Sequence, residues 1–355
     1  MSKDTFTWHP DQDDEYDGAR YGSTTLQGLP FSAFDKNIGK SFTMKGDDDD
    51  TLTLSPTGGD AYWCKEVPSI SHVSEFNVTG GTFAIRPPQA GTLTLGAYAT
   101  ALQTINLNIG GTFLARQTNF IGFDSGFSPE VTFEILPRGK CCISEGGVFS
   151  GTFAINIHDL GSMSVSALVM RISNGTYLAN GISNAGRPSL ELIASRSLAN
   201  PQSGWLEIQR HEIVCKSASI SRLEATALSL TETDIRAADS ASLLIACDTI
   251  DVDSNTVFAI GQGSAAITFT GSEKNEAPFD FFKKSYPKGL FNFITTEGAN
   301  QSAFKFLNIG SAFDLSKMQA DGVITINGAP DTQHKCDWRL EADGSNKYFV
   351  IFLKS

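Results

Sequence analysis

Polar and apolar residues alternate strictly in many short segments of the chain, and this alternation indicates β-strands. In the segment 104–109, Ile105, Leu107 and Ile109 share one face, with polar residues between them. Since successive side chains of a strand point to opposite sides, such a segment is predicted to be a strand with one buried face. The same alternation recurs at 130–135, 162–166, 227–231, 249–253 and 266–270.

Four short phrases combine a turn with the start of a strand. Each places a glycine before a threonine, an aromatic residue and two apolar residues, at 81–85, 111–115, 151–155 and 175–179. Glycine permits a sharp turn, and threonine beside an aromatic residue suits a half-buried strand. The steps between the glycines (81 to 111, 111 to 151 and 151 to 175) are unequal. Irregular repeats on this scale predict a turn-plus-strand unit reused along a solenoid, with loops of variable length.

Many short strands can form a sandwich, a propeller or a parallel β-helix. Small residues at the start of each repeat, variable loops and polar outward positions favour the β-helix. The alanine-containing segment 221–246 could be read as a helix, but its alternation favours strands. In these features, residues 70–270 resemble right-handed parallel β-helix proteins such as pectate-lyase-like enzymes, phage tailspikes and adhesin passengers. The predicted fold is therefore an all-β parallel β-helix, with a β-sandwich as the alternative.

The chain is predicted to have three parts. Residues 1–70 contain two acidic clusters, with Gly-, Ser- and Thr-rich pieces and isolated aromatic residues between them, which is typical of an extended acidic arm with an N-terminal cap. Residues 71–270 form the β-helical body. Residues 271–355 form a linker and a C-terminal β cap, since open stacks need capped ends. The final apolar segment, 348–353, is expected to be tucked under the body or buried against another subunit.

The charge balance limits the partners of the protein. With 27 Lys and Arg against 39 Asp and Glu, the net charge is −12, which disfavours nucleic acid and anionic membranes. The first residues lack the apolar core of a secretory signal, and no apolar run approaches the roughly 18 residues that span a bilayer. The six cysteines are scattered, unlike those of a small disulfide scaffold. We therefore expect a cytoplasmic protein or a virion component.

Glu232, Asp234 and Arg236 are the candidate catalytic residues. If 231–237 is a strand, their side chains point the same way at intervals of roughly 6.8 Å. Inverting glycosidases hold two carboxyl groups about 6.5–9.5 Å apart, so Glu232 and Asp234 fit by spacing and Arg236 could hold a uronate. The alternative is a solvated polar face of a strand.

Asp248, Asp251 and Asp253 are candidate ligands for Ca²⁺. The sequence from Asp251 begins like a calcium loop, in which alternating oxygens converge on a hard cation. An EF-hand would need glycine and glutamate where this chain has Thr256 and Gln262, so only a simpler surface site is open. The alternative is again an outward polar row. No other cofactor is expected.

Exposed aromatic residues are the candidates for ligand binding. Phe120, Phe123 and Phe127 lie in a glycine-containing, loop-like stretch, and Trp205 follows a predicted turn at 201–204. Aromatic side chains on loops give a large, rigid contact area for sugars or proteins. The alternative is that they fill the core.

These features favour a non-enzymatic structural or attachment protein. We expect a homo-oligomeric, β-helical component of a larger assembly, such as a phage tail or tailspike, that binds a partner protein or a surface glycan. Two alternatives remain: a polysaccharide lyase or glycoside hydrolase on the same scaffold, and a secreted bacterial effector or adhesin. The preference depends largely on the resemblance in fold.

Overall fold

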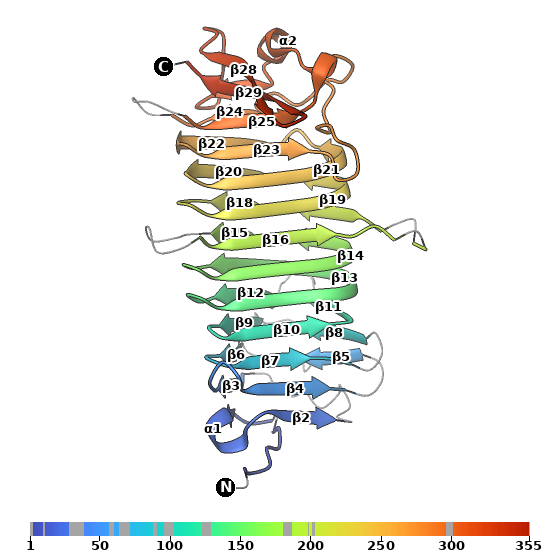
Figure 1. Ribbon diagram of the computed structural model, residues 1–355, viewed down its shortest axis with the longest axis vertical. Helices are drawn as coiled ribbons and strands as arrows, with labels where there is room; N and C mark the ends of the chain where they lie inside the picture. The colour runs from blue at the N-terminus through green and yellow to red at the C-terminus, as the bar shows by residue number, and fades with distance from the viewer. Residues whose placement is uncertain are drawn as a thin grey trace. The chain divides into compact units, whose positions relative to one another are not determined.

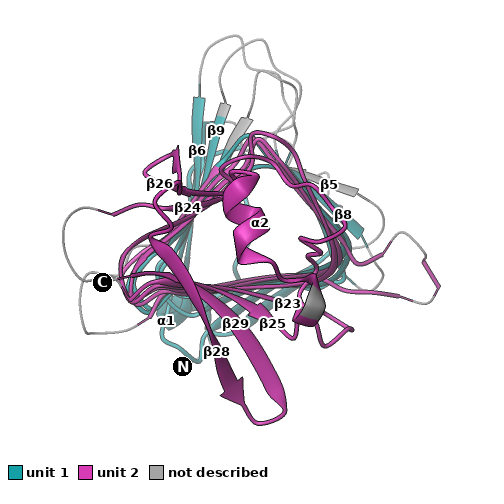
Figure 2. Ribbon diagram, turned by 90° about the horizontal axis from the view of Figure 1, so that it is seen from above, with its two compact units in different colours: residues 1–175 teal, residues 176–355 magenta. Residues whose placement is uncertain are grey.

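The described part of the chain is all-β, and its strands pair largely in parallel, in an arrangement that is consistent with a β-helix (Figure 1). The chain divides into two compact units, residues 1–175 and 176–355 (Figure 2). The division falls inside the segment 71–270 that the sequence predicts to be one body. The computed structural model describes residues 3–9, 11–27, 39–56, 60–63, 72–87, 91–95, 103–122, 129–179, 187–197, 199–200, 203–295 and 301–354.

The strands of the first unit stack in three parallel ladders. Within this unit, one ladder runs β1–β3–β6–β9–β12–β13, another runs β2–β4–β7–β10–β13–β14, and the third runs β5–β8–β11–β13–β14. The long strand β13 therefore takes part in all three. The elements are β1 (Asp14–Asp17), α1 (Gly18–Tyr21), β2 (Thr24–Gln27), β3 (Ser41–Lys45), β4 (Thr51–Ser55), β5 (Asp60–Trp63), β6 (His72–Val78), β7 (Thr82–Ile85), β8 (Gly91–Leu95), β9 (Gln103–Ile109), β10 (Thr112–Arg116), β11 (Thr118–Gly122), β12 (Pro129–Ile135), β13 (Lys140–Ile157) and β14 (Ser162–Ser173).

The beginning of the chain takes part in these ladders. β1 pairs in parallel with β3, and β2 pairs with β4. Tyr16 of β1 is fully buried. The structure thus does not confirm a separate extended arm over residues 1–70, because the described strands of this segment stack like those that follow.

The repeated phrases of the sequence occupy more than one ladder. Phe83 of β7 pairs directly with Phe113 of β10, so the step between the first two phrases is one coil of the chain. Phe153 of the third phrase instead pairs with Val131 of β12. The longer step from the second phrase to the third is therefore not one coil, because the third phrase lies in a different ladder.

The second unit also contains three parallel ladders. These run β15–β18–β20–β22–β24–β26, β16–β19–β21–β23–β25 and β17–β19–β21. The elements are β15 (Thr176–Ala179), β16 (Ser189–Ala194), β17 (Trp205–Gln209), β18 (Glu212–Cys215), β19 (Ile220–Thr231), β20 (Asp234–Asp239), β21 (Ser242–Val252), β22 (Val257–Gly263), β23 (Ala266–Thr270), β24 (Phe291–Phe293), β25 (Ala303–Leu307), the 3-10 helix η2 (Gly310–Ala312), α2 (Leu315–Ala320), β26 (Ile324–Ile326), β27 (Ala329–Pro330), β28 (Cys336–Asp343) and β29 (Asn346–Leu353).

The coils of this unit are short and regular around β19 to β21. Trp205 pairs with Ala227 and Ala227 with Thr249, so two successive coils have the same length. The segment 221–246 consists of strands joined by turns, as its alternation predicts. Inward residues stack like on like: Ile213 pairs with Ile235, and Phe258 with Phe291. Ile235 also pairs with Phe258, and all four of these side chains are buried, so the ladder from β18 to β24 carries a continuous apolar column.

The chain ends in an antiparallel arrangement. β29 pairs with β25 on one edge and with β28 on the other. Val350 and Ile351 of β29 are fully buried, so the last apolar segment packs against its own chain, one of the two expected outcomes. Within the described ranges, no helix has the length and apolar character needed to cross a membrane.

Candidate functional site

The outward side of β17, β19 and β21 forms a face with an exposed aromatic residue. In these parallel neighbours, Trp205, Ala227 and Thr249 form one row across the strands, and Glu207, Ser229 and Asp251 form the next. The intervening residues Leu206 and Leu228 are buried, so period-2 alternation directs the two rows outward. The Trp205 face is defined as Trp205, Glu207, Ala227, Ser229, Thr249 and Asp251.

Trp205 gives this face its apolar contact area. Its side chain is 42% exposed, although tryptophan is highly buried on average. Its direct neighbour across the strands, Ala227, ends at Cβ, and the next residue in the row is Thr249. The indole therefore lies beside a row of small side chains.

The second row supplies polar groups. Glu207 and Asp251 are separated by Ser229, and the two strand spacings place their Cα atoms roughly 10 Å apart. Gln209 donates a hydrogen bond from Nε2 to Glu207 Oε1. Two carboxylates and a hydroxyl thus lie beside the aromatic residue on one surface.

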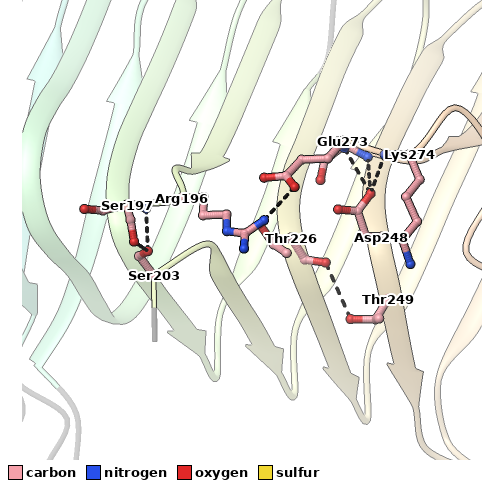
Figure 3. A network of polar contacts seen from close by, with 9 residues as sticks. Arg196, Ser197, Ser203, Thr226, Asp248, Thr249, Glu273 and Lys274 are labelled. Carbon is pink, nitrogen blue, oxygen red and sulfur yellow. Dashed lines mark hydrogen bonds and ion pairs between the residues drawn. The ribbon is translucent and has the colours of Figure 1, made fainter. Parts of the chain in front are cut away.

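A network of polar contacts adjoins the Trp205 face (Figure 3). Arg196, which follows β16, donates from Nη1 to Glu273 Oε2 at 2.6 Å. Glu273 lies in the turn after β23, so the ion pair joins segments that are far apart in the sequence. Both side chains are about half exposed, and such pairs contribute only about 0–1 kcal/mol. The main consequence of the Arg196–Glu273 ion pair is therefore to position the turn at 272–274.

Asp248 of β21 holds the same turn more firmly. Its Oδ1 accepts the backbone N–H groups of Ser272, Glu273 and Lys274, each at 3.0 Å (Figure 3). Burial raises the pKa of Asp248, but these hydrogen bonds outweigh burial and lower the pKa below its usual value. Thr249, the next residue, contributes to the Trp205 face, so the turn is anchored at the border of that face.

The structure does not gather the three aspartates proposed for Ca²⁺. Asp248 binds the turn, whereas Asp253 accepts hydrogen bonds from Glu232 N, Asn255 N and Thr256 Oγ1. Asp251 belongs to the outward row of β21. No group of three or more His, Cys, Asp or Glu side chains is placed to hold a metal ion in the part of the chain that the structure describes.

Glu232 and Asp234 lie in different ion pairs. β19 ends at Thr231 and β20 begins at Asp234, so 231–237 is not one strand and the assumed strand spacing does not apply. Glu232 is in the intervening turn with φ +49°, and its Oε2 lies 3.1 Å from Arg210 Nε. Arg236 Nε donates to both carboxylate oxygens of Asp234 at 3.0 Å. Each candidate carboxylate is thus held by its own arginine.

The aromatic candidates have different surroundings. Phe120 of β11 is fully buried, and its ring centroid is 5.8 Å from that of Phe149. Its expected role as a surface aromatic is therefore wrong, because an inward position of β11 places it in the core of the first unit. Phe123 and Phe127 lie outside the described residues. Trp205 is exposed as the hypothesis requires.

Sequence reasoning missed Glu207 and Ser229. Glu207, Ser229 and Asp251 follow one another at the same sequence interval, which is the length of one coil in this part of the unit. The spacing becomes informative once the coil length is known, because residues one coil apart are neighbours in a solenoid. The irregular glycine intervals do not reveal this length.

The architecture by itself assigns no function, because one fold supports many unrelated activities. The function has to be argued from the Trp205 face and from the residues around it. Compared with protein-family models, with curated proteins and with solved structures, the chain matches none.

Proposed function

We propose that this protein is a non-enzymatic attachment component of a larger assembly, built as a right-handed parallel β-helix, and that it binds a glycan through the Trp205 face. In this proposal, residues 271–355 are the C-terminal cap of the β-helix. The observation that carries the proposal is the 42% exposure of Trp205 beside two rows of small and polar residues.

A sugar chain suits the chemistry of this face. The C–H side of a pyranose packs on an aromatic ring, which offers a rigid, amphipathic contact area. Glu207, Asp251 and Ser229 offer acceptors and a hydroxyl donor for sugar hydroxyl groups. The two carboxylates and the net charge of −12 repel polyanions. We therefore expect a neutral glycan.

The arrangement of the carboxylates supports binding over catalysis. Glu232 and Asp234, whose spacing suggested a glycosidase, are engaged with Arg210 and Arg236. A hydrolase needs one carboxyl group to protonate the leaving oxygen and another to activate water or attack the sugar. A lyase or hydrolase activity, the alternative function, is therefore an outcome that the experiment must distinguish.

The test compares binding of the full chain to immobilised dextran, mannan, xylan and galactan, with polygalacturonate and alginate as acidic probes. Trp205→Ala should weaken binding to a neutral glycan by about tenfold or more, which corresponds to roughly 1.4 kcal/mol. Phe282→Ala is the matched control, because this aromatic residue is 67% exposed outside the face.

Binding that is unchanged in Trp205→Ala, or no binding by the wild type to any neutral glycan, would refute the proposal. Reducing-sugar release is measured in the same samples. Release that persists in Trp205→Ala and disappears in Asp234→Asn would favour the enzymatic alternative.

A further inference from the structure

β28 presents an exposed edge of the sheet. It pairs antiparallel with β29 from Cys336 to Asp343, and within the described part of the chain it pairs with no other strand. Two of its apolar side chains are exposed, Trp338 to 42% and Leu340 to 54%. An edge of this kind is a template for pairing with another strand.

In the β28–β29 hairpin, hydrogen-bonded and non-bonded residue pairs alternate, and this alternation shows which backbone groups face the free edge. Lys354 donates its backbone N–H to Lys335 O at 2.8 Å, just beyond the paired strands. Since bonded and non-bonded pairs alternate in an antiparallel ladder, the odd-numbered residues of β28 bond to β29. The backbone groups of Trp338, Leu340 and Ala342 therefore point to the free edge. In agreement, the Trp338 N–H bonds to the side-chain Oδ1 of Asp337.

We propose that two copies of this chain pair antiparallel through β28, around a twofold axis at Leu340. In this register Leu340 lies opposite the partner's Leu340, and Arg339 lies opposite the partner's Glu341. The symmetry produces this opposite-charge pair twice, as an isologous interface requires. Arg339 already donates to Glu341 of its own strand, so in the dimer each guanidinium would lie between two carboxylates. Trp338 then lies opposite the partner's Ala342, which matches a large side chain with a small one.

Other symmetric registers, in which the even-numbered residues of β28 likewise bond to the partner, are less favourable. An axis at Arg339 or at Glu341 places identical charges opposite each other, which is destabilising. An axis at Ala342 places Glu341 opposite the partner's Asp343. An axis at Trp338 needs the N–H of Cys336, which donates to Asp331 Oδ2 at 2.9 Å in a buried hydrogen bond. The proposed register needs instead the N–H of Trp338, whose hydrogen bond to the neighbouring Asp337 is exposed and would be exchanged for one to the partner.

The proposed register also has costs. Asp337 would lie opposite the partner's Asp343, although Lys354 Nζ lies 3.9 Å from Asp337 and offsets part of its charge. One pair of strands as short as β28 buries less than the roughly 1,200 Å² of a stable interface. We therefore expect a dimer that dissociates on dilution. Because each copy carries a net charge of −12, the two copies repel each other, and salt should strengthen the dimer by screening this repulsion.

The test is sedimentation equilibrium of the full chain over a range of concentrations. Arg339→Glu and Glu341→Arg should each weaken dimerisation by about tenfold or more, since each places like charges across the axis. An equimolar mixture of the two variants should form heterodimers, because the opposite charges are then restored between copies.

Two further variants separate pairing from folding. Leu340→Pro removes an N–H that faces the free edge and is not used by β29, so it should abolish the dimer with the circular dichroism spectrum retained. Phe282→Ala should leave the equilibrium unchanged. A wild type that is monomeric at all concentrations, a trimer, or oligomers that persist in both charge variants would overturn the proposal. The outcome does not depend on glycan binding.

Discussion

Phe83 and Phe113 pair in register on neighbouring strands, with ring centroids 5.8 Å apart and ring planes 13° from parallel. Both rings are fully buried, and the ring centroid of Phe76 lies 4.6 Å from that of Phe83. Aromatic pairs of this kind contribute about 0.5–1.5 kcal/mol beyond the burial of their area. The stacking of equivalent side chains is thus a main source of stability for the first unit.

Phe113→Ala should lower the free energy of unfolding by about 3–5 kcal/mol, because it leaves a cavity in a packed column. Urea denaturation followed by circular dichroism gives the value. Phe282→Ala, which removes an exposed ring, should change it by about 0.5 kcal/mol or less. Equal effects of the two substitutions would contradict the inward stacking.

Gly81→Ala should be more destabilising than Gly289→Ala. Both glycines have positive φ, +69° and +74°, so the conformational strain of an added Cβ is similar. A Cβ at Gly81 would lie 2.8 Å from Asp50 O, whereas the nearest atom to a Cβ at Gly289 is 3.8 Å away. We expect a cost of about 1 kcal/mol at Gly289 and a clearly larger one at Gly81. Thermal denaturation of the two variants would show the difference, and equal shifts in Tm would argue against the close approach.

Asp248→Asn should destabilise the second unit by about 1–3 kcal/mol at pH 7, because three backbone donors lose a charged acceptor. The folded-state pKa of Asp248 is lowered, so its contribution is present above the unfolded pKa of about 3.9 and is lost as the pH falls through the folded pKa.

The difference in urea midpoint between wild type and Asp248→Asn should therefore shrink below about pH 4. Asp251→Asn is the control, since this carboxylate lies in an outward row of the same strand. A difference that is constant from pH 7 to pH 3 would contradict the role of the ionised carboxylate.

Cys215 and Cys247 should resist alkylation in the folded protein. Burial raises the pKa of Cys215 to about 11 and that of Cys247 to about 12, and the thiolate is the reactive species. Cys142, which is only half-buried, should react before either of them at pH 8. Mass spectrometry of iodoacetamide-treated protein locates the label, and treatment in urea shows that all thiols can react. Labelling of Cys215 as fast as Cys142 would show that the core opens.

The strands were predictable because their alternation is local. The segments at 104–109 and 227–231 are strands as expected, and the parallel pairing follows from repeats that cannot bury their apolar face alone. The ladder to which the third phrase (151–155) belongs is harder to predict, because neighbouring ladders have similar residues at their turns and strand starts. In β1 and β3, polar and apolar residues alternate over only four and five residues. Such short segments do not show from the sequence that the two strands pair.

The candidate site was only partly predictable. Trp205 was identified because it follows a turn, but Glu207 and Ser229 are recognisable only from the coil length. Glu232 and Asp234 were grouped because sequence spacing does not show a turn with positive φ at Glu232. The sequence around Phe120 predicts a loop because Gly122 resembles a turn residue, but this glycine is the last residue of β11.

The equal intervals that separate Trp205, Ala227 and Thr249 have a consequence for evolution. A tandem duplication or loss of one such block would insert or remove a whole layer while every remaining layer kept its neighbours in register. The Trp205 face could therefore lengthen or shorten stepwise, one row at a time, by gene rearrangement alone.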